Sequence, residues 1–175
     1  MNADASAAPT RLVPVIIPIT TAVLIPAVLW ILLSGLAVLP VPVVVRYLIG
    51  LPLTALGIWM VADAVNRVYL RQNTPLGDKP PERLVHNGWY RVMRNPMAVG
   101  MTGLLVGEAI MLGSVPVLAW AVVVFAVSCI AALKVEEPSL LAAFDDEYAR
   151  YARETPRWLP SPTRLQALVR AKLSR

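Results

Sequence analysis

The sequence predicts an all-α integral membrane protein with four transmembrane helices in two hairpins and an amphipathic helix at the cytoplasmic face. Hydrophobic residues make up 57% of its 175 residues and charged residues 15%, with a mean hydropathy of +0.63, which is too apolar for a soluble domain of this size. Four apolar segments reach or approach the roughly 20 residues that a helix needs to cross the hydrocarbon core. Lys and Arg gather after the second and the fourth of these segments.

The first predicted hairpin joins residues 12–33 and 43–65 through a short Pro-rich turn. Pro14, Pro18 and Pro26 should kink the first segment, which a membrane helix tolerates when its neighbours satisfy the freed carbonyls. The residues before it lack the basic stretch of a secretory signal, and the apolar run is too long for one. We therefore expect a first span that is retained.

The second predicted hairpin joins residues 96–112 and 115–133 through Gly113 and Ser114. Gly103 and Gly107 have the four-residue spacing of a membrane contact motif, which favours close helix packing, although glycine also makes room for a ligand. We treat the whole chain as a single membrane domain.

The basic residues predict the orientation, because Lys and Arg mark the cytoplasmic side of a bacterial-type inner or plasma membrane. They concentrate in the loop 66–95 and in the C-terminal region 138–175, whereas the opposite side has only Arg46. Both termini are therefore expected in the cytoplasm. Within the C-terminal region, Pro138 suits the start of a helix, and apolar residues then recur at helical spacing, so this region should lie along the membrane surface, in contact with the lipid bilayer.

A first candidate binding feature precedes the third apolar segment. Asn87-Gly88 is a turn signal, and Pro96 restricts Asn95 to an extended conformation before the helix begins. The free backbone N–H groups of that helix, together with Arg94, could hold a carboxylate or phosphate. The alternative is a plain start of a helix at the interface.

A second candidate feature, Lys134, Glu136 and Glu137, ends the fourth segment. The carboxylates either reach water and pair with Lys134, or face a cavity and hold a cationic ligand. The short hairpin returns the chain to the side where Arg94 and Asn95 lie. Positive charge and donors on one side, with carboxylates on the other, suit an amino-acid zwitterion.

Other polar residues have weaker implications. Glu108, deep in the third segment, either makes a polar contact that holds helices together or is part of a tunnel for a substrate. Asp63 and Arg67, one helical turn apart, should form a structural pair. His86, the only histidine, could act as a base but has no partner identifiable by spacing. The sequence contains no metal-ligand cluster, and we expect neither a metal nor a nucleic acid as partner.

Three motifs in these segments resemble the membrane methyltransferases of the isoprenylcysteine carboxyl methyltransferase and phospholipid methyltransferase type. Gly88-Trp89-Tyr90 matches a Gly-x-Tyr, Arg94-Asn95-Pro96 an Arg-(His or Asn)-Pro, and Glu136-Glu137 an acidic pair. A fourth stretch, from Phe144 to Tyr151, matches a closing Phe-Gly-x-x-Tyr-x-x-Tyr, except that Asp145 stands in place of Gly. The resemblance covers about half of the chain, from residue 84 to residue 160.

The resemblance implies S-adenosyl-L-methionine as cofactor and a lipophilic methyl acceptor. The positions that it places against the cofactor are Leu84, Val85, Tyr90, Asn95, Pro96, Met97, Ala98, Glu136 and Glu137. It identifies no catalytic acid or base, so Arg94 and Asn95 are candidates for positioning only, and Glu108 and Lys134 are weak candidates for the substrate side.

Two departures from the family pattern bear on the substrate and on activity. Ala98 replaces a usual Tyr, and Ala132 stands where the prenylcysteine enzymes have an Arg that grips the substrate carboxylate. We therefore expect methyl transfer to a lipophilic or small apolar acceptor at the cytoplasmic face. The alternative from another class is a non-catalytic membrane scaffold or small-molecule binding protein of the same fold.

Overall fold

The computed structural model describes residues 13–33, 38–72 and 81–160, together with positions 162, 166 and 170. These residues are helical or irregular, and the β-structure among them is an isolated bridge between Val38 and Ser114. The loop predicted over 66–95 is thus described in part, and most of the C-terminal region after residue 160 lies outside the described residues.

The first apolar segment forms one continuous helix with a π turn in the middle. Helix α1 spans Val13–Ile19, the π turn η2 spans Thr20–Leu24, and α2 spans Ile25–Leu33. In the π pattern, the Thr21 carbonyl would accept from residue 26, but Pro26 has no N–H. The indole of Trp120 donates to the Thr21 carbonyl instead, at 3.1 Å, so a helix packed alongside satisfies the group that proline frees.

Helices α3, Val43–Val65, and α4, Pro96–Leu112, make the most extensive helix–helix contact of the fold. Glycines bring the two backbones together at two levels. A Cβ at Gly57 would lie 2.5 Å from the Gly100 carbonyl oxygen, and one at Gly107 would lie 2.7 Å from the Gly50 carbonyl oxygen. Gly100 and Gly107 therefore serve helix packing, whereas a Cβ at Gly103 would make only an ordinary contact of 3.7 Å with Leu53.

A tight turn connects α4 to α5, Val115–Ala131. Gly113 adopts the left-handed conformation with φ 64°, and Ser114 caps α5 by accepting from the Val117 N–H at 3.4 Å. The predicted Gly113-Ser114 hairpin is therefore formed by the two residue types that favour the end and the start of a helix.

The chain continues from α5 through a second π turn, η5, Ala132–Glu136, into α6, Glu137–Glu154. As in the first helix, the π turn ends two residues before a proline, here Pro138. Helix α6 bends at Asp145, whose φ of 40° and ψ of −118° are outside the helical region. The helix that was predicted to start at Pro138 is therefore present as α6, but it begins one residue earlier, and a π turn joins it to α5 without a break.

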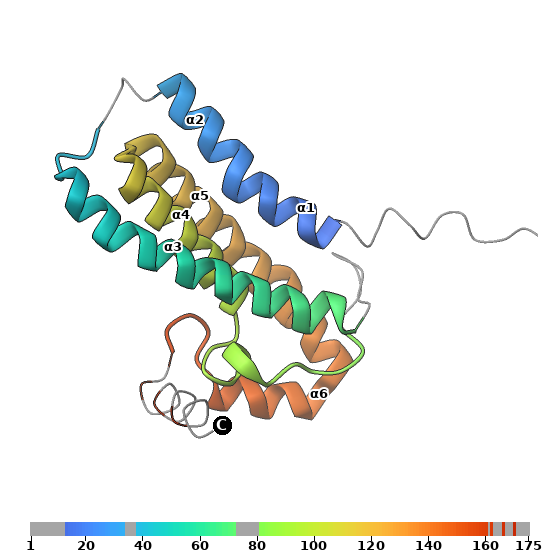
Figure 1. Ribbon diagram of the computed structural model, residues 1–175. Coiled ribbons are helices and arrows are strands. Elements are labelled where there is room, and N and C mark those ends of the chain that lie inside the picture. The colour runs from blue at the N-terminus through green and yellow to red at the C-terminus, as the bar shows by residue number, and fades with distance from the viewer. Residues whose placement is uncertain are drawn as a thin grey trace, which may run out of the picture.

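Figure 1 shows α2, α3, α4 and α5 running side by side, with α6 lying across one end of this bundle. The main core lies where η2, α3, α4 and α5 meet, and includes Ala22, Val61, Leu105 and Ala121. Three of the described helices, over residues 16–33, 43–70 and 115–154, are long and apolar enough to span a membrane, whereas α4 has 17 residues and falls just short.

Candidate functional site

The site is built where α4 begins, at the end of the bundle that α6 crosses (Figure 1). Pro96 occupies the first turn of the helix, as the sequence predicts. Asn95 precedes the helix with φ −120° and ψ 61°, which is outside the extended region that the sequence predicted for it. The Asn95 side chain caps no backbone N–H. Asn95 Nδ2 and Arg94 Nε are both buried, and neither has a hydrogen-bond partner within the part of the chain that the structure describes. Such donors are costly to bury unless a ligand or water uses them.

Glu137 joins the start of α4 to the segment after α6. Its carboxylate accepts two hydrogen bonds from Arg157, from Nε at 2.7 Å and from Nη2 at 2.9 Å, and lies 3.2 Å from Arg94 Nη1. The bidentate contact is the strong geometry for a guanidinium and a carboxylate, and it raises the pKa of Arg157 above its ordinary value. Arg94 and Glu137 are mostly buried, at 13% and 16% side-chain exposure.

Two backbone hydrogen bonds add to this ion cluster, which consists of Arg94, Glu137 and Arg157. The Arg94 N–H donates to the Pro156 carbonyl at 2.8 Å, and the Asn95 N–H donates to the Arg157 carbonyl at 3.2 Å. Trp158 packs edge-on against Phe125 of α5, with ring centroids 5.5 Å apart. The segment after α6 is thereby held against the first residues of α4.

The bend in α6 directs two tyrosines toward the same region. Tyr148 is 5% exposed, and Tyr151 donates through its hydroxyl to the Tyr90 carbonyl at 2.7 Å. Asp145, at the bend, stands where the resembling family has Gly, and its positive φ gives a physical reason for that Gly, because only glycine adopts such angles at little cost. The closing motif therefore specifies a bent helix rather than a straight one.

Glu136 differs from its neighbour Glu137. It is exposed, and the ion pairs of the described residues include none with Glu136. Burial raises the pKa of Tyr90 well above its usual range, and the nearby Tyr69 and Glu136 raise it further. Tyr90 therefore stays a neutral phenol, and Glu136 is the carboxylate of the pair that has no ion pair with a cation of the described residues.

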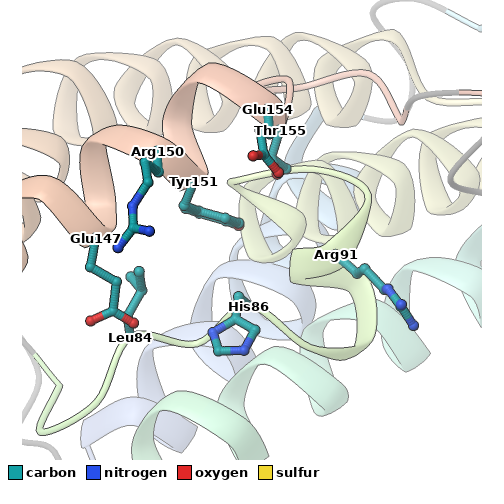
Figure 2. A pocket seen from close by; sticks show the side chains of 8 residues that line it. All are labelled: Leu84, His86, Arg91, Glu147, Arg150, Tyr151, Glu154 and Thr155. Atoms are coloured by element: carbon teal, nitrogen blue, oxygen red, sulfur yellow. The ribbon is translucent and has the colours of Figure 1, made fainter.

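A cavity of about 290 Å³ lies between α6 and the segment that leads to α4 (Figure 2). Leu84, His86 and Tyr151 line it, with Arg91, Glu147, Arg150, Glu154 and Thr155 completing the lining. Figure 2 shows Arg150 reaching from α6 toward Leu84 and Glu147, while Arg91 points away from the other lining residues. Of the residues that the family resemblance places against the cofactor, only Leu84 lines this cavity, so we place the candidate site at the ion cluster and regard the cavity as its outer neighbour.

The remaining residues that the sequence predicted for the site do not all lie at the ion cluster. Tyr90, Met97 and Ala98, which are near Arg94 and Asn95 in the sequence, are half-buried. Pro96 is buried. Glu108 is about 18 Å along α4 from Pro96, with one carboxylate oxygen buried and unpartnered among the described residues. Lys134 is exposed, and the ion pairs of the described chain do not link it to Glu136 or Glu137. The structure thus groups Arg94, Asn95 and Glu137, but not Glu108 or Lys134.

Sequence reasoning missed Arg157 as a member of the site. It was counted with the basic residues that set the orientation, and no spacing rule links it to Glu137, 20 residues earlier. The one available signal was its place in the closing stretch beside Pro156.

A family of known proteins matches the part of the chain that contains Arg94, Asn95 and Glu137. The family description for phospholipid methyltransferases matches residues 45–147, which is more than half of the chain. The chain belongs to the phospholipid methyltransferase family. The match runs from α3 through α4 and α5 into α6, so it includes Arg94, Asn95, Glu136 and Glu137. No curated protein matches the chain.

Membership of this family and three apolar helices of spanning length indicate an integral membrane protein with a methyltransferase-type function. The resemblance identified from the motifs is confirmed. The match ends before Arg157, so the residue that holds Glu137 most closely lies outside the matched part of the chain.

Proposed function

We propose that the protein transfers a methyl group from S-adenosyl-L-methionine to a lipophilic or small apolar acceptor at the cytoplasmic face of the membrane. The observation that carries this proposal is the grouping of Arg94 and Asn95, with buried donors left over, beside an acidic pair of which only Glu137 is paired with cations of the described residues. A zwitterion needs donors for its carboxylate and a free carboxylate for its ammonium, and this end of the bundle has both.

The residues present fit the cofactor. Asn95 Nδ2 and Arg94 Nε can donate to its carboxylate, and Glu136 can accept from its ammonium. Glu137 is occupied by Arg94 and Arg157, so we assign it to holding the site together rather than to contacting the cofactor. S-adenosyl-L-methionine supplies an electrophilic methyl group when bound.

The chain's own contribution is alignment and exclusion of water. In-line methyl transfer to a nucleophile needs little acid–base help, so most of the acceleration can come from orientation in a dry site. Tyr90, held through its carbonyl by Tyr151, provides a neutral phenol at the wall of the site. We assign no general base, and His86 is exposed on the outer cavity.

The proposed topology has four spans, with both termini and α6 on the cytoplasmic side. Helix α4 is about 25 Å long, somewhat less than a hydrocarbon core of about 30 Å. Because it packs closely against α3 and also contacts α5, it does not need to match the lipid thickness by itself. The basic residues of the segments around the site favour the cytoplasmic side, and the charged, exposed face of α6 suits the membrane surface.

The choice of methyl acceptor is inferred from Ala132, which is 1% exposed and carries no charge. Lys134 is exposed on another side of the π turn. Without a guanidinium there, the site lacks the bidentate grip that suits a carboxylate. A free prenylcysteine should therefore be a poor acceptor compared with a lipid-like acceptor. Efficient formation of a base-labile methyl ester on farnesylated cysteine, in a radiolabel assay, would contradict this assignment.

Isothermal titration of the protein in nanodiscs with S-adenosylhomocysteine tests the cofactor assignment. Glu136→Gln should weaken binding roughly tenfold, because it removes a charge-assisted hydrogen bond. Glu82→Gln, a change of an exposed acid outside the cluster, is the matched control and should leave affinity unchanged. Absence of binding to the wild-type protein would favour the non-catalytic scaffold.

A further inference from the structure

The residue that carries a further inference is Arg67, at the end of α3 in the third π turn, η3, Asn66–Leu70. Its Nε donates to Asp63 Oδ2 at 2.8 Å, which confirms the predicted pair. Its Nη1 donates to Asn87 Oδ1 at 2.6 Å, 20 residues further along the chain. One guanidinium therefore joins the end of α3 to the segment that precedes α4.

The turn after Asn87 lies directly on this ion pair. Gly88 has φ +60°, and a Cβ added to it would lie 2.5 Å from Arg67 Nε and 2.7 Å from Asp63 Oδ2. Any side chain here would be strained by the backbone angle and would also displace the guanidinium. The glycine of the Gly88-Trp89-Tyr90 motif is thus explained by the close approach of the backbone to Arg67.

Two further contacts attach the same segment to α3. Gln72 donates to the Arg67 carbonyl at 3.3 Å and accepts from the Arg83 N–H at 2.9 Å. Trp89 packs edge-on against Trp59 of α3, with ring centroids 5.0 Å apart. The segment is therefore held both to α3 and to the residues that follow it.

The held turn is the 3₁₀ turn η4, Gly88–Arg91, which carries Tyr90 and leads directly to Arg94 and Asn95. On its other side, Tyr151 of α6 donates to the Tyr90 carbonyl at 2.7 Å. The turn η4 therefore contacts α3 on one side and α6 on the other. We infer that Arg67 is a positioning residue that, through Asn87 and Gly88, sets the placement of Tyr90 and of the start of α4 for cofactor binding.

This role differs from that of an ordinary stabilising ion pair. Arg67 and Asp63 lie one helical turn apart, so their pairing is local to the end of α3. The α3–α4 interface depends instead on the glycine contacts described above. Loss of the Arg67–Asn87 contact should therefore loosen the turn while the helix bundle stays folded, and misplacement of a binding residue by a small distance is enough to reduce affinity.

The inference depends on the proposed cofactor, so its test has one measurement that needs no ligand. Asn87→Ala removes the contact with Arg67 and leaves the Asp63–Arg67 pair intact, and Arg71→Gln, a change of an exposed Arg shortly after η3, is the control. Hydrogen exchange of the full chain in nanodiscs should become roughly tenfold faster in residues 87–91 of Asn87→Ala, as expected from losing a hydrogen bond to a charged group. Residues 50–65 and 100–112 should exchange as in the wild type.

The second measurement is the affinity for S-adenosylhomocysteine by isothermal titration. Asn87→Ala and Arg67→Gln should each weaken binding several-fold to tenfold. Arg67→Lys should recover it only in part, because an ammonium cannot reproduce the forked contact with two partners. Unchanged exchange in residues 87–91, or faster exchange through the whole bundle, would overturn the inference. Lack of ligand binding by the wild type, with the exchange result as expected, would overturn the proposed function and leave the holding of the turn by Arg67 established.

Discussion

The two ends of the α4–α5 hairpin use polar groups in opposite ways. At the end where the hairpin turns, the polar groups form hydrogen bonds with one another. Arg46 donates to the carbonyls of Val41 and Leu39 at 2.7 and 2.8 Å, and the Leu39 N–H donates to the Gly113 carbonyl at 2.9 Å. Ser114 is 2% exposed and caps α5. Within the turn itself, residues 109–117, no described buried polar side chain lacks a partner, although Glu108 Oε2 in the preceding part of α4 does.

The other end retains unused polar groups. Arg94 Nε, Asn95 Nδ2 and Trp89 Nε1 are buried and unpartnered within the described part of the chain. Two of the three π turns described also lie here, η3 with Arg67 and η5 with Glu136, and such turns often accompany functional sites because they redirect side chains. One end of the hairpin is therefore built for closure, whereas the other keeps donors and a carboxylate that a ligand could use.

The largest expected effect concerns the sides of the membrane on which the two ends lie. In a Cys129→Ser background, Pro40→Cys at the closed end should react with an impermeant thiol reagent in intact cells. His86→Cys, at the end with the site, should react only after lysis. Both positions are exposed, so reactivity reports the side and not burial. Labelling of both, or of neither, in intact cells would contradict the proposed four-span topology.

The next effect separates Glu137 from Glu136. Glu137→Gln should lower the free energy of unfolding by about 2 kcal/mol, which is less than the roughly 3–5 kcal/mol for breaking a fully buried pair, because Arg157 is 34% exposed. Glu136→Gln should leave stability unchanged. Reversible unfolding by SDS in mixed micelles measures the free energy of unfolding of both variants. An equal decrease in the two would mean that Glu137 does not have a structural role that Glu136 lacks.

At the closed end, Arg46→Ala should lower the free energy of unfolding by about 1–2 kcal/mol, because two carbonyls lose a charged donor. Affinity for S-adenosylhomocysteine should stay at the wild-type value. Weaker binding in this variant would show that the two ends are coupled, contrary to the comparison above.

A smaller effect is expected from Tyr151→Phe, which removes the 2.7 Å hydrogen bond to the Tyr90 carbonyl. Stability should fall by about 1 kcal/mol, and affinity for S-adenosylhomocysteine should fall several-fold because the turn loses its contact with α6. Tyr47→Phe, a change of an exposed tyrosine of α3 near the closed end, should alter neither quantity.

The smallest effect concerns the bend in α6. Asp145→Gly should raise the free energy of unfolding by about 0.5–1 kcal/mol, since glycine adopts a positive φ without the steric cost that aspartate incurs. Asp146→Gly, at the next position with ordinary helical geometry, should lower it by about 1 kcal/mol. If both variants are destabilised, α6 is not bent at Asp145 in the folded protein.

The helices themselves could be predicted from local features of the sequence. Helices α3 and α4 have the same bounds as two predicted apolar segments, because Pro42 and Pro96 mark their starts and an apolar run extends to their ends. The Gly113-Ser114 turn and the Asp63–Arg67 pair followed from spacing in the same way. Each of these features depends on residues within a few positions of one another, so backbone stereochemistry and helical period are sufficient to predict them.

The sequence by itself thus determined most of the helices and the family, and it predicted that the segments with Arg94 and Glu137, which form an ion pair, lie on the same side of the bundle. Only the tertiary structure decided that Glu137 is held by Arg157, that Arg67 holds Asn87, and that Tyr151 holds Tyr90. The bend at Asp145 and the π turns also escaped prediction, because both break the helical period on which the predictions relied. Contacts between residues 20 or more positions apart depend on how the helices pack and on where α6 crosses the bundle, and no local periodicity encodes that placement.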